Sequence, residues 1–171
     1  PAMKMSVLNK LLEQRAYTDA HTGLPNKDAC EVLLNNKETV AKHTACIMFD
    51  LNNLKIINDT KGHSKGDQLI LNFARLLRNV IPQKDFVGRY GGDEFMVVIY
   101  NTSKTEIEDI LKQLSREKDR LNSSGNNMPI DYACGWAISD ADSECTIQML
   151  LDKADYYMYE NKQAYKKSKK S

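Results

Sequence analysis

The sequence predicts a single domain of the α+β or mixed α/β class. Its 171 residues suit one domain of ordinary size. Apolar residues at helical spacing alternate along the chain with short runs of β-forming residues. Two of these runs, residues 86–90 and 95–100, flank the pair Gly91-Gly92, which is typical of a hairpin turn. A hairpin among helical crossovers excludes a doubly wound parallel sheet.

The N-terminal segment, residues 1–18, is expected to contain a helix. Apolar residues at positions 5, 8, 11, 12 and 16 fall on one helical face. This helix either packs on the domain or is the end of a longer upstream signalling helix. A loop over residues 19–26 follows, and Asn26 is a suitable N-cap for a short helix that contains Cys30, Leu33 and Leu34.

The first expected strand covers residues 44–50. It is a continuous apolar run that ends in Asp50, the pattern of a strand covered on both faces. A short helix is expected from Asn52 to Asp59, ending near Gly62. The later elements expected are helix starts at Ser64-x-x-Asp67 and Ser103-x-x-Glu106, a strand over residues 130–138, and a last helix from Thr146 to about Lys166.

Charge and composition exclude several classes of protein. The formal net charge is +1, but the last ten residues hold five lysines and no acid, so residues 1–161 carry a formal charge of −4. A mildly acidic body argues against a nucleic-acid interface. No apolar run approaches the ~18 residues of a membrane-spanning helix, so no membrane contact is expected from this domain.

The four cysteines lie far apart and form no Cys-x-x-Cys pair, so reduced and packed thiols are expected. The first ten residues have no pattern of a secretion signal. A cytoplasmic location is therefore expected, and a full-length protein could still be anchored to a membrane upstream.

The turn Gly91-Gly92-Asp93-Glu94 places two carboxylates side by side. A generic turn of this composition is a solvated hairpin tip. Asp50 favours a second interpretation, because an apolar strand ends in a carboxylate when that group has a partner such as a cation. Carboxylates from separate strands, together with backbone carbonyls, suit Mg²⁺.

Three segments together resemble a known family. RYGGDEF (residues 89–95), FDLNNLKIINDTKGHSKGD (49–67) and DAHTGLPN (19–26) are similar to the motifs of the GGDEF domain, the diguanylate cyclase family. The similarity covers residues 19–166 and leaves residues 167–171 as a basic tail. It implies a central, mostly antiparallel sheet flanked by helices, similar to adenylyl cyclase and polymerase palm domains.

The resemblance implies a metal site. Asp50, the carbonyl of Leu51 and Asp93 would hold Mg²⁺ or Mn²⁺, and Asp93 would take the proton from the attacking 3′-hydroxyl. Glu94 would assist at the metal or orient the turn. These roles suit phosphoryl transfer, which depends mainly on positioning and charge neutralisation. The spacing does not decide which of the two acids is the base.

The resemblance also implies a nucleotide site. Asn58 and Asp67 match the positions that read the guanine edge of GTP. The alternative is that Asn58 ends a helix and that Asp67 completes the helix start at Ser64. Gly91 and Gly92 would keep the turn free of side chains where the nucleotide lies over it.

Two lysines of the last helix match the cations that meet the β- and γ-phosphates. Lys162 and Lys166 lie one turn apart and face the same way. The remaining lysines, Lys167, Lys169 and Lys170, are expected to form a solvated tail.

Several residues depart from the family's motifs. Asn52, Leu54, His21 and Tyr165 do so outside the matched metal and guanine positions. Asn52 and Leu54 are expected to change the shape and charge of the loop that wraps the phosphates. Pro82 stands where many members carry an arginine that binds an inhibitory cyclic di-GMP dimer. Inhibition through that site is therefore not expected.

The implied activity is that of a diguanylate cyclase, which joins two GTP molecules into cyclic di-GMP and releases two pyrophosphates. Each domain would hold one GTP whose 3′-hydroxyl attacks the other GTP, so catalysis would need a two-fold homodimer. An upstream sensory domain is expected in the full-length protein. The alternative is a GGDEF domain that binds GTP without turnover and regulates a neighbouring domain. A third interpretation, a protein-interaction module, leaves the clustered carboxylates unexplained.

Overall fold

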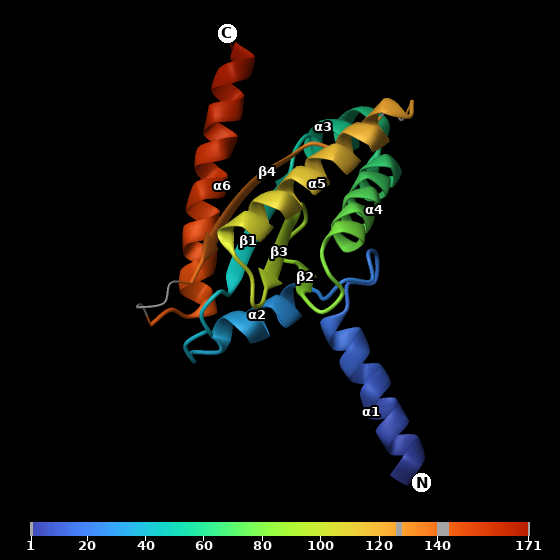
Figure 1. Cartoon of the computed structure of the whole chain (residues 1–171). Helices are drawn as coiled ribbons and strands as arrows, with labels where there is room; N and C mark the ends of the chain where they lie inside the picture. Colours follow the sequence, from blue (N-terminus) through green and yellow to red (C-terminus); the bar gives the residue numbers. More distant parts are fainter. Residues whose placement is uncertain (1, 126–127, 140–143, 171) are drawn as a thin grey trace.

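A central sheet with helices on both faces forms the body of the protein (Figure 1). This computed structural model describes residues 2–125, 128–139 and 144–170. The two ends of the chain lie far apart in Figure 1. In chain order the elements are α1 (Ala2–Tyr17), α2 (Lys27–Asn35), β1 (Ala45–Leu51), α3 (Leu54–Lys61), α4 (His63–Val80), β2 (Phe86–Arg89), β3 (Glu94–Ile99), α5 (Lys104–Ser123), β4 (Tyr132–Ile138) and α6 (Ile147–Lys170).

The sheet has the strand order β2-β3-β1-β4, and each neighbouring pair is antiparallel. β1 lies between β3 and β4, and all seven of its residues are buried. Burial on both faces explains why its sequence is continuously apolar. β2 and β3 form the expected hairpin. The predicted α+β class and the antiparallel sheet are confirmed.

The side chains of β1 alternate between two apolar cores. On one face, Phe49 packs edge-on against Phe73 of α4, with ring centres 5.9 Å apart, and Phe73 packs against Phe95 of β3 at 5.0 Å. On the other face, Met48 belongs to a cluster that includes Leu150 of α6. The two cores fix β1 from both sides, so its carboxyl end is held rigidly.

The helix starts follow the predicted caps in two cases and differ in a third. Asn26 and Ser103 each accept a hydrogen bond from the backbone N–H three residues later, as expected. Ser64 does not cap α4, which begins at His63 with Gly62 as its N-cap. Gly62 has φ of 89°, a left-handed conformation that favours glycine, and it separates α3 from α4.

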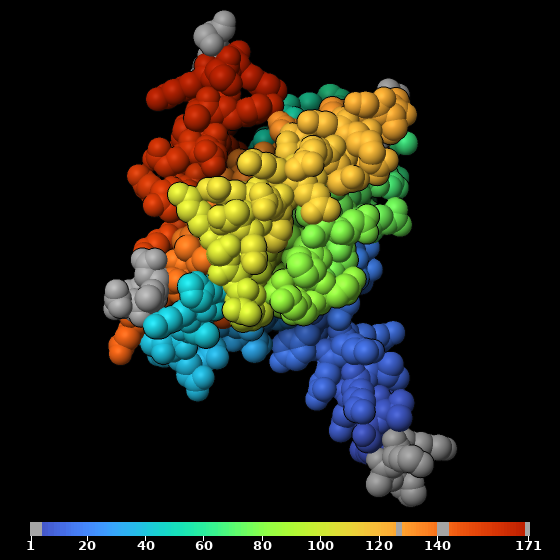
Figure 2. Space-filling model, in the orientation of Figure 1, coloured from blue at the N-terminus to red at the C-terminus, as the bar shows by residue number. Residues whose placement is uncertain are grey.

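Both terminal helices extend beyond the body. α6 continues through Lys170, so the lysines expected in a tail belong to this helix. α1 projects away from the domain (Figure 2), and Met5, Leu8 and Leu12 remain 62%, 49% and 55% exposed. The apolar stripe of α1 is therefore not buried on the domain. Among the described residues, no helix has the length and apolar character needed to cross a membrane.

Cys30, Cys46 and Cys134 are free thiols, as predicted. Burial raises the pKa of Cys30 and that of Cys46 to about 12. These two thiols therefore stay protonated at neutral pH and act as small apolar groups in the core.

Gly135 of β4 allows α6 to approach the sheet closely. A Cβ at this position would overlap the backbone nitrogen of Met158 and the backbone oxygen of Ala154, both in α6. The helix backbone therefore lies directly against the strand.

We expect Gly135→Ala to reduce the free energy of unfolding by about 2 kcal/mol or more, because rigid backbone must move to admit the methyl group. Urea unfolding measures the effect. Gly92→Ala is the control, since no atom lies within 4 Å of the added Cβ. Equal stability of both variants would contradict the close approach of α6.

Candidate active site

Asp50 is a buried carboxylate at the end of the central strand, with a side chain that is 12% exposed. Its Oδ2 accepts a hydrogen bond from Lys162 Nζ of α6 at 2.6 Å. Its Oδ1 is buried and has no hydrogen-bond partner among the described residues. A buried charged oxygen without a donor is unfavourable unless a cation is near. One oxygen of Asp50 is thus paired with Lys162, and the other is free to act as a ligand of a cation.

Asp93 and Glu94 place two further carboxylates next to Asp50. Glu94 is the register partner of Asp50 across β1 and β3, and Asp93 lies in the turn just before it. Burial raises the pKa of Asp93, and the negative charge of Asp50 raises it further. The pKa of Glu94 is raised by burial and by the charges of Asp50 and Asp93. A cation bound among these groups would relieve their repulsion.

The backbone of Leu51 adds an oxygen at the same place. Its N–H donates to the carbonyl oxygen of Asp93 at 2.8 Å. The N–H and C=O of one residue in an antiparallel strand point to the same side, so the Leu51 carbonyl also faces the hairpin turn. The structure therefore brings Asp50, the Leu51 carbonyl and Asp93 to the same end of the sheet.

These oxygens fit a hard divalent cation. In the described part of the chain, no three side chains of His, Cys, Asp or Glu form a metal site by themselves. A bound ion would therefore need the Leu51 carbonyl and oxygens from water or phosphate besides Asp50 and Asp93. Mg²⁺ is commonly bound in this way, by one or two carboxylates plus water and phosphate oxygens.

Arg89 holds the hairpin turn in place. Its guanidinium donates to the carbonyl oxygens of Gly91 and Gly92, at 3.2 and 2.8 Å, and to Asp19 at 3.2 Å. Asp19 also accepts hydrogen bonds from the backbone and hydroxyl of Thr22. Burial acts to raise the pKa of Asp19, but the hydrogen bonds and the charge of Arg89 outweigh it and lower that pKa. Sequence reasoning assigned no role to Arg89, because its partners are seen only in the fold.

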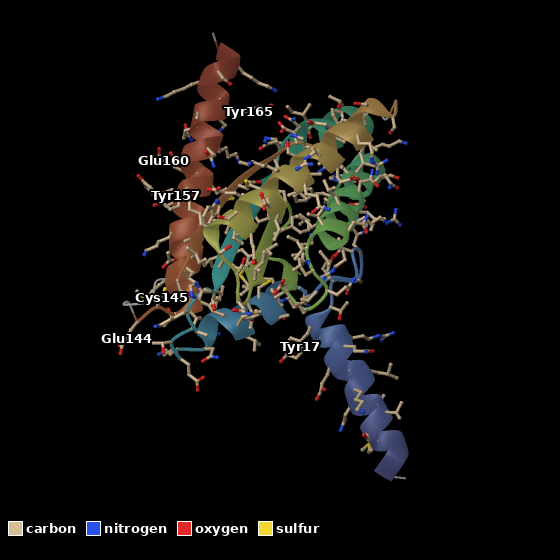
Figure 3. The ribbon with its side chains drawn as sticks, in the orientation of Figure 1. Tyr17, Glu144, Cys145, Tyr157, Glu160 and Tyr165 are labelled. Carbon is tan, nitrogen blue, oxygen red and sulfur yellow. The ribbon has the colours of Figure 1, made fainter. Side chains whose placement is uncertain are left out.

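A pocket of about 680 Å³ opens beside Asp93, between the start of α3 and the end of α6; we call it the lysine pocket. It is lined by Lys162, Lys166 and Lys169, which the spacing of the helix places on one side. The Lys169 ammonium lies 4.7 Å from the ring centre of Tyr165, which also lines the pocket and is labelled in Figure 3. Lys169 is exposed to solvent, as expected, but it belongs to α6 and lines the pocket. Its distance of seven residues from Lys162, two helical turns, was the signal in the sequence.

Asn58 and Asp67 lie on the adjacent helices α3 and α4, outside the residues that line the lysine pocket. The side chain of Asn58 packs so closely on Gly66 that a Cβ at Gly66 would overlap its amide. The side chain of Asp67 is exposed, and its backbone carbonyl accepts a hydrogen bond from His21 at 2.7 Å. The alternative role of Asp67 in a cap with Ser64 is excluded, because Gly62 is the cap.

Asp85 is a buried carboxylate with a structural role. It is 4% exposed, and its Oδ1 accepts a hydrogen bond from the backbone N–H of Tyr100 at 3.1 Å. Pro82 follows the end of α4 and marks the break before β2, as expected. Asp85 therefore fixes the start of β2 to the end of β3, and its buried side chain is not presented on the surface.

The comparisons with known proteins agree with this arrangement. The family model described as "Diguanylate cyclase, GGDEF domain" matches residues 16–168. The chain therefore belongs to the GGDEF domain family. The fold class and the family expected from the sequence are both confirmed.

The curated relatives include proteins named as diguanylate cyclases and one named as a cyclic di-GMP phosphodiesterase. The diguanylate cyclase DgcP of Escherichia coli is 30% identical over 94% of this chain and 48% of its own length. The signaling protein YkoW of Bacillus subtilis is 31% identical over 92% of this chain and 20% of its own length. The cyclic di-GMP phosphodiesterase PdeB of Shewanella oneidensis is 31% identical over 87% and 18%. The chain thus spans between about a fifth and a half of the length of these relatives.

Solved structures share the fold. The GGDEF domain of DgcB from Caulobacter crescentus, in complex with cyclic di-GMP, has a TM-score of 0.73 at 25% identity and covers 87% of this chain and 91% of its own. A structure of DgcB that includes a coiled coil has a TM-score of 0.81 at 23% identity, covering 95% and 89%. A microbial GGDEF domain with cyclic di-GMP has a TM-score of 0.75 at 26% identity, covering 90% and 94%.

The arrangement around Arg89 predicts the effect of a conservative change. Arg89→Lys keeps the charge but cannot bond both glycine carbonyls and Asp19 at once. We expect faster amide hydrogen exchange across residues 91–94 and a loss of about 1–2 kcal/mol of stability. Arg116→Lys, at an exposed position of α5, is the matched control and should change neither quantity. Unchanged exchange in Arg89→Lys would show that the turn does not depend on the guanidinium.

Proposed function

We propose that this domain condenses two GTP molecules into cyclic di-GMP and releases two pyrophosphates, with Mg²⁺ or Mn²⁺ as its cofactor. The observation that carries the proposal is the meeting of Asp50, the Leu51 carbonyl, Asp93 and Glu94 at one end of the sheet, in a chain of the GGDEF family. The raised pKa values of Asp93 and Glu94 support a site that gains from a bound cation.

We assign each side chain to metal binding, proton transfer or phosphate binding. Asp50, Asp93 and the Leu51 carbonyl would hold the ion, which supplies neutralisation of the phosphate charge. Asp93 would also accept the proton of the attacking 3′-hydroxyl. Glu94 would help to hold the turn and the ion. Lys162 touches Asp50 and lines the lysine pocket, so its ammonium can neutralise either a carboxylate or a phosphate.

The substrate would lie across the hairpin with its phosphates in the lysine pocket. Lys162 and Lys166 would bind the β- and γ-phosphates. Asn58 and Asp67 would read the guanine edge, since a carboxylate accepts from the N1–H and 2-amino groups that adenine lacks as a pair. The carbonyls of Gly91 and Gly92 are already fixed by Arg89, so their backbone is set before the nucleotide binds.

Catalysis would require a two-fold dimer, because each 3′-hydroxyl attacks the α-phosphate held by the other copy. α1 supports dimerisation. Met5, Leu8 and Leu12 are spaced by three and four residues and are exposed, which is the pattern of a helix that packs on a second helix. The expectation of an upstream sensory domain in the whole protein rests on the family resemblance; the curated relatives DgcP and YkoW are longer than this chain.

The second candidate is a GGDEF domain that binds GTP without turnover and regulates a neighbouring domain. The relative named as a cyclic di-GMP phosphodiesterase favours it, and so do Asn52 and Leu54, which line the lysine pocket and depart from the family's motifs. Incubation of the purified domain with GTP and Mg²⁺, followed by separation of the nucleotides, distinguishes the two. Cyclic di-GMP supports the cyclase, whereas thermal stabilisation by GTP without consumption supports the regulator.

Asp93→Asn tests the metal site. We expect the rate of product formation to fall at least about 100-fold, because the lost charge matters most in the transition state. GTP binding, measured by calorimetry, should weaken far less, and the rise in melting temperature on addition of Mg²⁺ should shrink. Asp109→Asn, at an exposed position of α5, is the control. Turnover close to that of the parent would remove Asp93 from the site.

Asp67→Ala tests the reading of the base. The preference for GTP over ATP should fall by about 100-fold, because the site loses the acceptor that distinguishes guanine. Binding constants for both nucleotides give the ratio. Asp59→Ala, an exposed acid on the neighbouring helix α3, should leave it unchanged. An unaltered ratio in Asp67→Ala would exclude this residue from base recognition.

A further inference from the structure

β4 is an edge strand whose outer side is open. Among the residues that the structure describes, the order β2-β3-β1-β4 leaves one side of β4 without a neighbouring strand. On the β1 side, the carbonyl oxygen of Asp131 accepts a hydrogen bond from the Asn52 N–H. The Ser139 N–H donates to the carbonyl oxygen of Thr44. Because strand residues alternate, the N–H and C=O of residues 132, 134, 136 and 138 point away from β1. An open strand edge of this kind can pair with another extended chain.

α6 forms one wall along this edge. The close approach at Gly135 brings the helix backbone against the strand. Lys153, Tyr157 and Asn161 repeat every four residues and therefore form one stripe on α6, beside the strand. Asn161 donates a hydrogen bond to the carbonyl oxygen of Cys134, which confirms that this carbonyl faces outward. Figure 3 shows Tyr157 about midway along the helix.

A groove of about 500 Å³ runs along the edge; we call it the β4 groove. Its floor is residues 135–138, and its walls are the α6 stripe and Lys104 at the start of α5. α5 and α6 pack on opposite faces of the sheet, so Lys104 and Lys153 stand on opposite sides of the groove.

The charge of the β4 groove is positive. The described residues that line it include two lysines and no acid. Lys104 lies 4.0 Å from Glu108, and the two side chains are 75% and 47% exposed, so this pair neutralises little of the lysine's charge. The lining therefore favours a ligand with negative charge on both sides of its backbone.

We propose that the β4 groove binds an extended acidic segment of a partner protein, which adds to the sheet as a fifth strand beside β4. Its backbone pairs with the outward N–H and C=O groups of Trp136 and Ile138. Successive side chains of a strand point to opposite faces, so two adjacent acids reach Lys104 and Lys153. A residue further along the segment packs on Tyr157.

A second copy of this chain is a poorer occupant. Self-pairing through β4 would bring two further lysines to the groove and no lining acid, so like charges would face each other. An acidic partner removes this repulsion and satisfies the open backbone groups in one step. The proposed site is independent of GTP chemistry, since Lys104 and Lys153 lie outside the residues assigned to the nucleotide and the metal.

Trp136 is the single tryptophan of the chain and lies in the β4 groove, so its fluorescence reports binding directly. The probes are eight-residue peptides of valine, threonine and tyrosine with two adjacent glutamates at varied positions. Matched peptides carry two lysines in place of the glutamates or N-methyl groups along the pairing edge. We expect saturable fluorescence changes with glutamate peptides, and at least about tenfold weaker binding of both matched sets.

The double variant Lys104→Glu/Lys153→Glu should lose at least about tenfold in affinity for the glutamate peptides and should bind the lysine peptides instead. Lys112→Glu/Lys167→Glu, at exposed positions on the same two helices, is the control and should bind as the parent does. Thermal melting checks that both variants fold, and GTP turnover should be alike in parent and variants.

Three outcomes would overturn the proposal. Absence of binding across the glutamate peptides is one, and equal binding of glutamate and lysine peptides is another. The third is concentration-dependent dimerisation that the peptides abolish and that changes Trp136 fluorescence, which would make a second copy the occupant. Failure of GTP turnover with intact peptide binding would concern only the proposed cyclase.

Discussion

A negative charge buried at the end of the central strand sets the arrangement of the groups around it. Asp50 reaches this position because β1 is covered on both faces and bordered by strands on both edges. A carboxylate in such a place needs a positive partner, and Lys162 crosses from α6 to provide it. The turn then adds the carboxylates of Asp93 and Glu94, and the negative charge of Asp50 repels both of them. The sheet thus concentrates three carboxylates and one ammonium group at one end of β1.

Sequence reasoning succeeded where one local pattern determines the structure. The hairpin, the buried strand and the caps at Asn26 and Ser103 each depend on a few adjacent residues. The meeting of Asp50 with the turn followed from those elements and from the resemblance to the family. The predicted cap at Ser64 was wrong because the left-handed conformation of Gly62 ends one helix and starts the next within a single residue.

Other features depend on residues that are distant in sequence. Arg89 bonds Asp19 across seventy positions, and no local pattern shows that pair. Lys169 joins the lysine pocket because α6 does not stop where the family motif ends. Tyr165 is one of the residues that depart from the family's motifs, and it contributes a ring against which Lys169 rests. Departures from a motif can thus add groups to a site as well as remove them.

The ion pair between Asp19 and Arg89 also has a mechanical consequence. α1 ends at Tyr17, two residues before Asp19, and Arg89 is bonded both to Asp19 and to the turn carbonyls. The backbone of Arg89 is tied to Pro25 of the same loop. The end of α1 and the hairpin turn are therefore connected by a short path of hydrogen bonds that runs along the surface, outside the hydrophobic core.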